Sequence, residues 1–221
     1  MSPVQNNSIN VKVCFVMDCT ASMEPWIHEA KTRTVQLTRE VQRQHPIANI
    51  QTSFVGYRDY GDEEPMIVLP FQTPQATQEQ IQGIRAEGGD DIAEDVAGAL
   101  ERALHQDWAG ADVRIVFHIA DAPAHGLDFH APHVSDRFPR GDPNGLDPRD
   151  FVERMSYLDI HFTFVRIHKS TDAMIEEFFN CYTKGGSFKV IDLRNQHRFG
   201  DEVTRSISAS ITQHYTTSQV S

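Results

Sequence analysis

The chain has 221 residues, 39% of them hydrophobic and 23% charged, which is the length and composition of one ordinary globular domain with a single core. Its 20 Lys and Arg against 31 Asp and Glu give a formal net charge of -11. That balance argues against nucleic acid or an anionic membrane surface as the partner, because both require a clustered basic face. No apolar run approaches the roughly 20 residues of a membrane-spanning helix, so we expect no membrane insertion. A cation and another protein are the expected partners.

Cysteine usage and the N-terminus indicate the compartment. Cys14, Cys19 and Cys181 form no Cys-x-x-Cys pair and are too few and too scattered for a disulfide framework. The polar stretch 1–8 lacks the apolar core of a signal peptide. We therefore expect a cytoplasmic protein.

Short apolar runs alternate with helical patterns along nearly the whole chain. Strands are predicted at 11–17, 49–57, 66–71, 113–120, 160–167 and 188–193, and helices at 22–44, 77–84, 92–105, 151–158, 171–184 and 201–215. This alternation is typical of a doubly wound, Rossmann-like α/β fold, with a mostly parallel sheet and helices on both faces.

One strand is expected to be antiparallel. Only a short acidic turn separates 49–57 from 66–71, and Pro70 favours an edge position for the second run. We expect a single domain over 10–216, a flexible N-terminal tail at 1–9 and a frayed C-terminal tail at 217–221.

Two of the most apolar strands end in aspartate, at Asp18 and Asp121. In a doubly wound sheet, ligands bind beyond the carboxyl ends of the strands, where the strand order reverses. Asp18, Thr20 and Ser22 occupy alternate positions of a tight loop, so their oxygens point to one side and can converge on one cation. Hard oxygen ligands suit Mg²⁺ best, with Mn²⁺ and Ca²⁺ as alternatives.

These residues carry a resemblance to a known family. Asp18-Cys19-Thr20-Ala21-Ser22 resembles the Asp-x-Ser-x-Ser motif that opens the metal ion-dependent adhesion site (MIDAS) of von Willebrand factor A-type (vWA) domains. Ile119-Ala120-Asp121 is similar to the end of the family's fourth strand, whose aspartate is the last ligand. The resemblance spans almost the whole chain and implies a non-catalytic domain that binds a metal ion and another protein.

The middle ligand of the family departs from its pattern here. The family has a threonine in a Gly-rich loop before a helix, whereas this chain has Gly88-Gly89-Asp90-Asp91. The resemblance implies that a carboxylate replaces the threonine: Asp91 is the expected ligand, and Asp90 and Asp95 are substitutes. A third carboxylate would hold the ion more tightly but attract a partner's acidic side chain less. Asp59, Asp90 and Asp95 are also expected to lie behind the ligands and orient them.

Further strings narrow the resemblance to one branch of the family. Gly56-Tyr57-Arg58-Asp59, Glu94-Asp95-Val96-Ala97-Gly98 and Asp121-Ala122-Pro123-Ala124-His125-Gly126 resemble the vWA domain that accompanies atypical alpha-kinases. No kinase domain is present in this sequence, so the resemblance to that branch implies no kinase activity.

Three alternatives stay open. The first is a hydrolase that acts on a phosphate or ester through a metal-bound water, with Asp18 or Asp59 as the acting carboxylate. Arg58 and loop histidines are the only candidates for its cationic clamp or general base. The second is a scaffold without metal. The third is a zinc site at histidines of the segment 118–133, but no helical spacing supports it, and solvated or structural histidines are favoured. The long segment 122–148 is expected to frame the partner surface.

Overall fold

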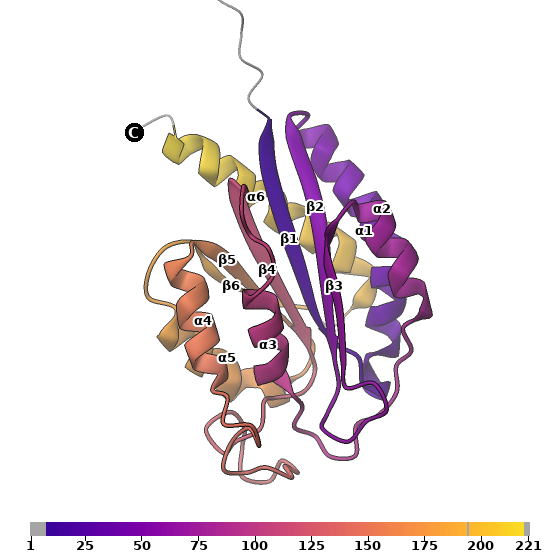
Figure 1. Ribbon diagram of the computed structural model, residues 1–221, viewed down its shortest axis with the longest axis vertical. Helices are drawn as coiled ribbons and strands as arrows, with labels where there is room; N and C mark the ends of the chain where they lie inside the picture. The colour runs from indigo at the N-terminus through magenta and orange to yellow at the C-terminus, as the bar shows by residue number, and fades with distance from the viewer. Residues whose placement is uncertain (1–7, 194, 219–221) are drawn as a thin grey trace, which may run out of the picture.

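The computed structural model describes residues 8–193 and 195–218 (Figure 1). Across these residues, six strands form one sheet in the order β3-β2-β1-β4-β5-β6. The strands are β1 (Ile9–Asp18), β2 (Ala48–Tyr57), β3 (Met66–Gln72), β4 (Val113–Ala120), β5 (Ile160–Arg166) and β6 (Phe188–Asp192). Neighbours are parallel except β2 and β3, so the predicted antiparallel edge strand and the doubly wound α/β fold are confirmed.

Helices cover both faces of the sheet. They are α1 (Glu24–Gln44), α2 (Pro74–Gln80), α3 (Val96–Leu104), α4 (Pro148–Tyr157), α5 (Asp172–Cys181) and α6 (Phe199–Ser218), with short 3-10 turns η1 (Ala21–Met23), η2 (Ile81–Gly83), η3 (Lys169–Thr171) and η4 (Gln196–Arg198). Helices α1, α2 and α6 pack on one face, and α3, α4 and α5 on the other (Figure 1).

Strand β1 shows why the sequence pattern predicts this architecture. Val13, Phe15 and Met17 belong to the core under α1 and α6, while Cys14 and Val16 belong to the core under α3 and α4. A strand that is buried on both faces needs apolar side chains at consecutive positions rather than alternate ones. The continuous apolar run at the start of the chain therefore becomes the central strand of the sheet.

The predicted helix 92–105 begins too early. Helix α3 starts at Val96, and Asp95 caps it by accepting a hydrogen bond from Gly98 N at 2.7 Å. The preceding residues are extended because Glu94 N donates to Pro123 O at 2.9 Å and forms a parallel bridge with Ala124. This long-range pairing frees the Glu94 side chain from the helix and places it in the loop.

Helices α2, α4 and α6 begin earlier than predicted, and α2 and α4 begin at cap signals that the sequence contains. Thr73 accepts from Ala76 N at 3.3 Å ahead of Pro74, the first residue of α2. Asp147 accepts from Arg149 N at 2.9 Å ahead of Pro148, the first residue of α4. Polar N-caps followed by proline are strong helix-start signals.

The predicted tails lie partly outside the described residues. Residues 1–7 and 219–221 are not described, while Ile9 already lies in β1, and α6 extends to Ser218. Over the described part of the chain, no helix is long and apolar enough to cross a membrane.

A buried polar pair lies between the sheet and the α3–α5 layer. His118 of β4 is fully buried, and its Nε2 lies 2.8 Å from the hydroxyl of Tyr57 on β2. Burial lowers the pKa of His118 to about 3 from a usual value of 6.5, so the ring is neutral in the folded protein. The unfolded chain takes up a proton at a higher pH than the folded one, so acid destabilises the fold through this residue.

We expect His118→Gln to reduce the loss of stability in mild acid. In the wild type, the free energy of unfolding should fall by up to about 1.4 kcal/mol per pH unit below the unfolded histidine's pKa because of this ring. Glutamine retains a polar atom for the Tyr57 hydroxyl but does not titrate. Urea denaturation of both proteins between about pH 7 and pH 5 measures the two slopes. Equal slopes would contradict the assignment.

Candidate metal centre

Asp18 and Asp121 meet at the point where the strand order reverses. Strands β1 and β4 are parallel neighbours with Met17 opposite Ile119, and from them the chain continues to opposite sides of the sheet. Asp18 is completely buried. Burial and, after it, the adjacent Asp121 carboxylate raise the pKa of Asp18 to about 8, so the two carboxyl groups lie within interacting range.

The loop after β1 gathers oxygens on one side. Asp18 Oδ1 accepts hydrogen bonds from Thr20 N at 2.8 Å and from Thr20 Oγ1 at 2.7 Å. Thr20 Oγ1 lies 3.4 Å from Ser22 Oγ. The other oxygen of Asp18, Oδ2, is buried and has no hydrogen-bond partner among the described residues. A buried carboxylate oxygen without a donor is costly, and it is the atom that a cation would satisfy.

Glu94 is a site residue that the sequence pattern did not predict. Its side chain is buried, its Oε2 has no hydrogen-bond partner in the described chain, and Asp18 is the nearby carboxylate that most affects it. Burial and, after it, the neighbouring carboxylates raise the pKa of Glu94 to about 10. A Cβ added to Gly89 would lie 3.5 Å from Thr20 Cβ and 3.6 Å from Glu94 Oε1, so the Gly-rich loop, Thr20 and Glu94 pack together.

The other acidic residues of the middle loop lie elsewhere. Asp91 Oδ2 accepts from Arg137 N at 2.5 Å, while its Oδ1 is buried without a partner among the described residues. Asp90 has an exposed side chain 3.4 Å from the Arg137 guanidinium. Asp95 caps α3. Of these three, only Asp91 lines the pocket at the carboxyl end of the sheet.

Asp59 lies beyond the end of β2 and belongs to a histidine network. Its Oδ1 is 2.7 Å from His125 Nε2, and His125 Nδ1 is 2.7 Å from Asp136 Oδ1. Asp136 Oδ2 in turn accepts from His130 Nε2 at 2.9 Å. Among the four histidines of the segment 118–133, His133 is exposed, whereas His118, His125 and His130 are buried and bonded.

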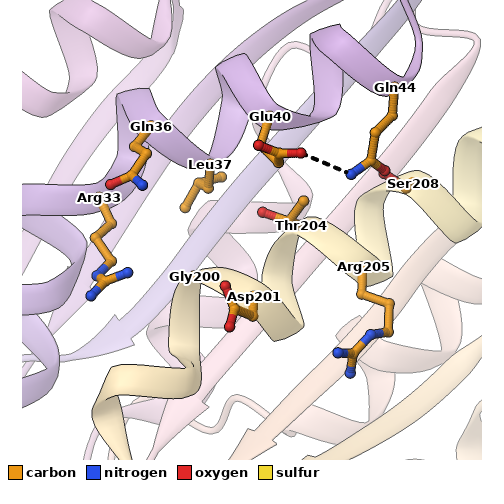
Figure 2. Close-up of a pocket in the computed structure, with 10 residues that line it drawn as sticks. All are labelled: Arg33, Gln36, Leu37, Glu40, Gln44, Gly200, Asp201, Thr204, Arg205 and Ser208. Carbon is orange, nitrogen blue, oxygen red and sulfur yellow. Dashed lines mark hydrogen bonds between the residues drawn. The ribbon is translucent and has the colours of Figure 1, made fainter.

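A pocket of about 860 Å³ opens above the loop of residues 18–22 after β1, which we call the metal loop. Its lining includes Thr20, Ser22, Gly89, Asp91, Glu94 and Asp121, together with residues of the loop after β4 and of η3. A smaller pocket, of about 380 Å³, lies between α1 and α6 and contains none of the predicted site residues (Figure 2). Residues of the segment 122–148, which is predicted to frame a partner surface, line the larger pocket.

Arg58 connects the metal loop to neighbouring segments by hydrogen bonds. This buried side chain donates from Nε to Cys19 O at 3.3 Å and from a terminal nitrogen to Arg85 O at 2.8 Å. Its other terminal nitrogen donates to Glu64 O. One planar guanidinium thus joins the metal loop, the β2–β3 turn and the approach to the Gly-rich loop, which a lysine cannot do.

Comparison with known proteins gives the family. Residues 12–132 match the model of the von Willebrand factor A domain, and the chain belongs to this family. It is 32% identical over 209 residues to the alpha-protein kinase vwkA of Dictyostelium discoideum, an alignment that covers 91% of this chain and 33% of that protein. The chain therefore spans about a third of the length of that relative. The predicted resemblance to the alpha-kinase-associated branch is confirmed.

Solved structures show the same fold at low identity. The pilus adhesin SpaC from Lactobacillus rhamnosus GG is 13% identical with a TM-score of 0.56, covering 91% of this chain and 30% of its own. The PilB minor pilin from Streptococcus sanguinis is 11% identical with a TM-score of 0.53, covering 93% and 63%. The SpRpn10 VWA domain is 12% identical with a TM-score of 0.50, covering 84% and 88%. At these identities the likeness shows the fold alone.

We expect Arg58→Lys to destabilise the protein by about 2 kcal/mol, because buried backbone carbonyls lose charged donors that a single ammonium group cannot replace. Urea denaturation measures the change. The matched control is Arg85→Lys, whose side chain is 81% exposed and should be nearly neutral. Similar losses in the two variants would contradict the bracing role of Arg58.

Proposed function

We propose that this vWA domain holds one divalent metal ion, with Mg²⁺ as the first candidate, and binds another protein through the surface around the ion. Asp18, Thr20, Ser22 and Asp121 would hold the ion directly or through water. The observation that carries the proposal is the buried Asp18 Oδ2, which has no donor among the described residues and adjoins a second carboxylate. A divalent cation supplies the positive charge that this arrangement of hard oxygen ligands requires.

The middle loop would complete the site with a carboxylate. Asp91 was the expected ligand and lines the same pocket, but one of its oxygens is bonded to Arg137 N. Glu94 is buried against Thr20 and Gly89, and its Oε2 is unpartnered in the described chain. We therefore propose Glu94 as the third acidic ligand and Asp91 as a neighbour. Asp59 and Asp95 would position the loops behind these ligands. Asp90 was also expected in this role, but its side chain is 81% exposed and points at Arg137, so we assign it none.

The charge of the site bears on the partner. Asp18, Glu94 and Asp121 together carry one more negative charge than a divalent ion neutralises. An incoming carboxylate would then meet a site with no positive excess, so completion of the metal shell by a partner's acidic side chain is disfavoured. The partner is expected to present neutral or basic groups to this surface, in keeping with the chain's net charge of -11.

Two of the helper groups named for the hydrolase alternative are already engaged. Arg58 donates to three backbone carbonyls, and both ring nitrogens of His125 are engaged by carboxylates. Neither side chain is placed to bind a phosphate or to accept a proton from water without breaking these bonds. A phosphatase and esterase screen with Mg²⁺ present tests this alternative directly.

We place the interaction in the cytoplasm. Cys14, Cys19 and Cys181 are all unpaired, and the first two are buried, where a thiol behaves as a small apolar group. Burial raises the pKa of both Cys14 and Cys19 to about 12, so neither is a reactive thiolate near neutral pH. Free thiols of this kind are typical of a reducing compartment.

Calorimetric titration of Mg²⁺ and Mn²⁺ into metal-free protein tests the ion site. We expect one ion to bind the wild type and Asp18→Ala to abolish binding. Glu94→Gln should weaken binding by about 10- to 100-fold, and more than Asp91→Asn does, because glutamine removes the third charge.

Asp90→Asn is the matched control for these substitutions. It removes an acidic group from the same loop, but its side chain is 81% exposed and points at Arg137. Its affinity for the ion should equal that of the wild type. Absence of heat for both ions in the wild type would remove the metal site and leave the domain as a scaffold. A larger effect of Asp91→Asn than of Glu94→Gln would return Asp91 to the ligand set.

Metal dependence of partner binding is a separate prediction. Affinity capture with the wild-type domain in Mg²⁺ should retain partners that are lost in EDTA and with Asp18→Ala. Glu153→Ala, an exposed change on α4, serves as the control that should retain them. Capture that is equal in Mg²⁺, in EDTA and with Asp18→Ala would show that partner binding does not depend on the ion.

A further inference from the structure

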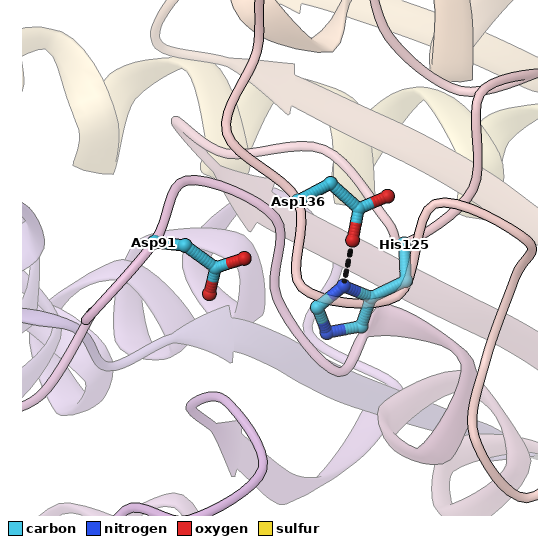
Figure 3. A group of neighbouring side chains, drawn as sticks. All are labelled: Asp91, His125 and Asp136. Atoms are coloured by element: carbon cyan, nitrogen blue, oxygen red, sulfur yellow. Dashed lines mark hydrogen bonds and ion pairs between the residues drawn. The ribbon is translucent and has the colours of Figure 1, made fainter.

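A second group of metal-ligating side chains lies beside the first site. Ligand atoms of Asp91, His125 and Asp136 all lie within 4.8 Å of one another. In Figure 3, Asp91 extends from one loop toward the His125 ring, and Asp136 reaches the same ring from another segment. Ligands at about 2.0–2.2 Å from one ion in a tetrahedral site are about 3.3 Å apart. An ion would therefore replace the 2.7 Å hydrogen bond between His125 and Asp136 and draw Asp91 toward them.

The cluster contains more negative charge than the surrounding groups balance. The Asp59 and Asp136 side chains are each 3% exposed or less, and both bond to His125. Even a protonated His125 neutralises only one of the three carboxylates that surround it. The nearest arginine, Arg137, directs its guanidinium to Asp90 and to Tyr60 O instead.

Two oxygens of the cluster lack donors. Asp59 Oδ2 and Asp91 Oδ1 are both buried, and neither has a hydrogen-bond partner among the described residues. The Asp59 residue as a whole is only 2% exposed. The Asp59 and Asp91 carboxyl groups lie within hydrogen-bonding range of each other. Hydrogen bonds within the network account for the other oxygens, whereas these two are satisfied only by a proton shared between them or by a cation.

We propose that Asp91, His125 and Asp136 form a second metal site, distinct from the one at Asp18, which takes a divalent transition-metal ion of the Zn²⁺ or Co²⁺ type. An imidazole nitrogen with carboxylates suits these ions, whereas Mg²⁺ prefers an all-oxygen shell. Nδ1 of His125, the nitrogen on the Asp136 side, binds the ion. Nε2 keeps the Asp59 carboxylate as the partner that orients the ring.

The site would connect two walls of the large pocket. Asp91 belongs to the loop before α3, and Asp136 to the long segment between β4 and α4. Asp136 also holds His130, which lines the pocket together with Asp91. An ion at this position fixes the long segment against the middle loop and thereby sets the shape of the surface around the first site.

Cobalt absorption provides the test. The whole chain is saturated with Mg²⁺ and titrated with Co²⁺, whose visible bands intensify when it leaves water for a low-coordination site with nitrogen ligands. We expect one Co²⁺ to bind and Zn²⁺ to displace it. His125→Gln should weaken binding about 100-fold or more, since removing even an outer partner of a ligand costs 10- to 100-fold. Asp91→Asn, at a partly exposed position, should also weaken it and serves if His125→Gln does not fold.

Two further variants test whether the Co²⁺ bands arise at the His125 cluster. His133→Gln removes an exposed histidine of the same segment and should leave the Co²⁺ bands unchanged. Asp18→Ala should abolish Mg²⁺ binding but keep the Co²⁺ bands, so the two proposed sites fail independently. The proposal is overturned if the wild type shows no change in the bands, or if Asp18→Ala abolishes them. It is also overturned if His133→Gln abolishes the bands and His125→Gln does not. The first result would leave His125 as a hydrogen-bonded bridge between Asp59 and Asp136.

Discussion

Carboxylates that leave water repel one another, and this domain collects them at the carboxyl ends of β1 and β4. The parallel pairing of these strands brings Asp18 and Asp121 together, and the middle loop adds Glu94. Burial and, after it, the neighbouring carboxylates raise the pKa of Asp18 to about 8 and that of Glu94 to about 10. Much of the surrounding structure holds these groups in place against their repulsion.

Hydrogen bonds from several loops fix the backbone around these carboxylates. Arg58 joins three carbonyls from different loops, and Glu87 N donates to Cys19 O at 3.1 Å. Gly88 has a positive φ of 87°, and a Cβ there would clash with the Asp62 carboxylate, so only glycine permits this close approach. Loops that are fixed in this way present the acidic side chains in one arrangement, which favours ion binding over general flexibility.

The middle loop contributes to two neighbouring clusters. Glu94 extends toward Thr20 and Asp18, while Asp91 extends toward His125 and Asp59. Both clusters contain buried oxygens without donors among the described residues, and Glu94 and Asp91 both line the large pocket. The replacement of the family's threonine by a strongly acidic loop thus changes the charge of the site and also extends the acidic region toward the long segment after β4.

The amino-acid sequence by itself determined the fold and the grouping of Asp18, Thr20 and Ser22 in one loop. Apolar runs that alternate with helical periodicity predict a doubly wound sheet, and Asp18, Thr20 and Ser22 are adjacent in the chain, so their convergence is a local property. The role of Glu94 depends on Pro123 O and Ala124, which hold its backbone extended, and the sequence pattern there favoured a helix. His125 and Asp59 are 66 positions apart and meet only because the β2–β3 turn and the loop after β4 lie at the same end of the sheet. Tertiary structure alone decided these contacts, because hydrogen bonds and charges between distant segments leave no periodic trace in the sequence.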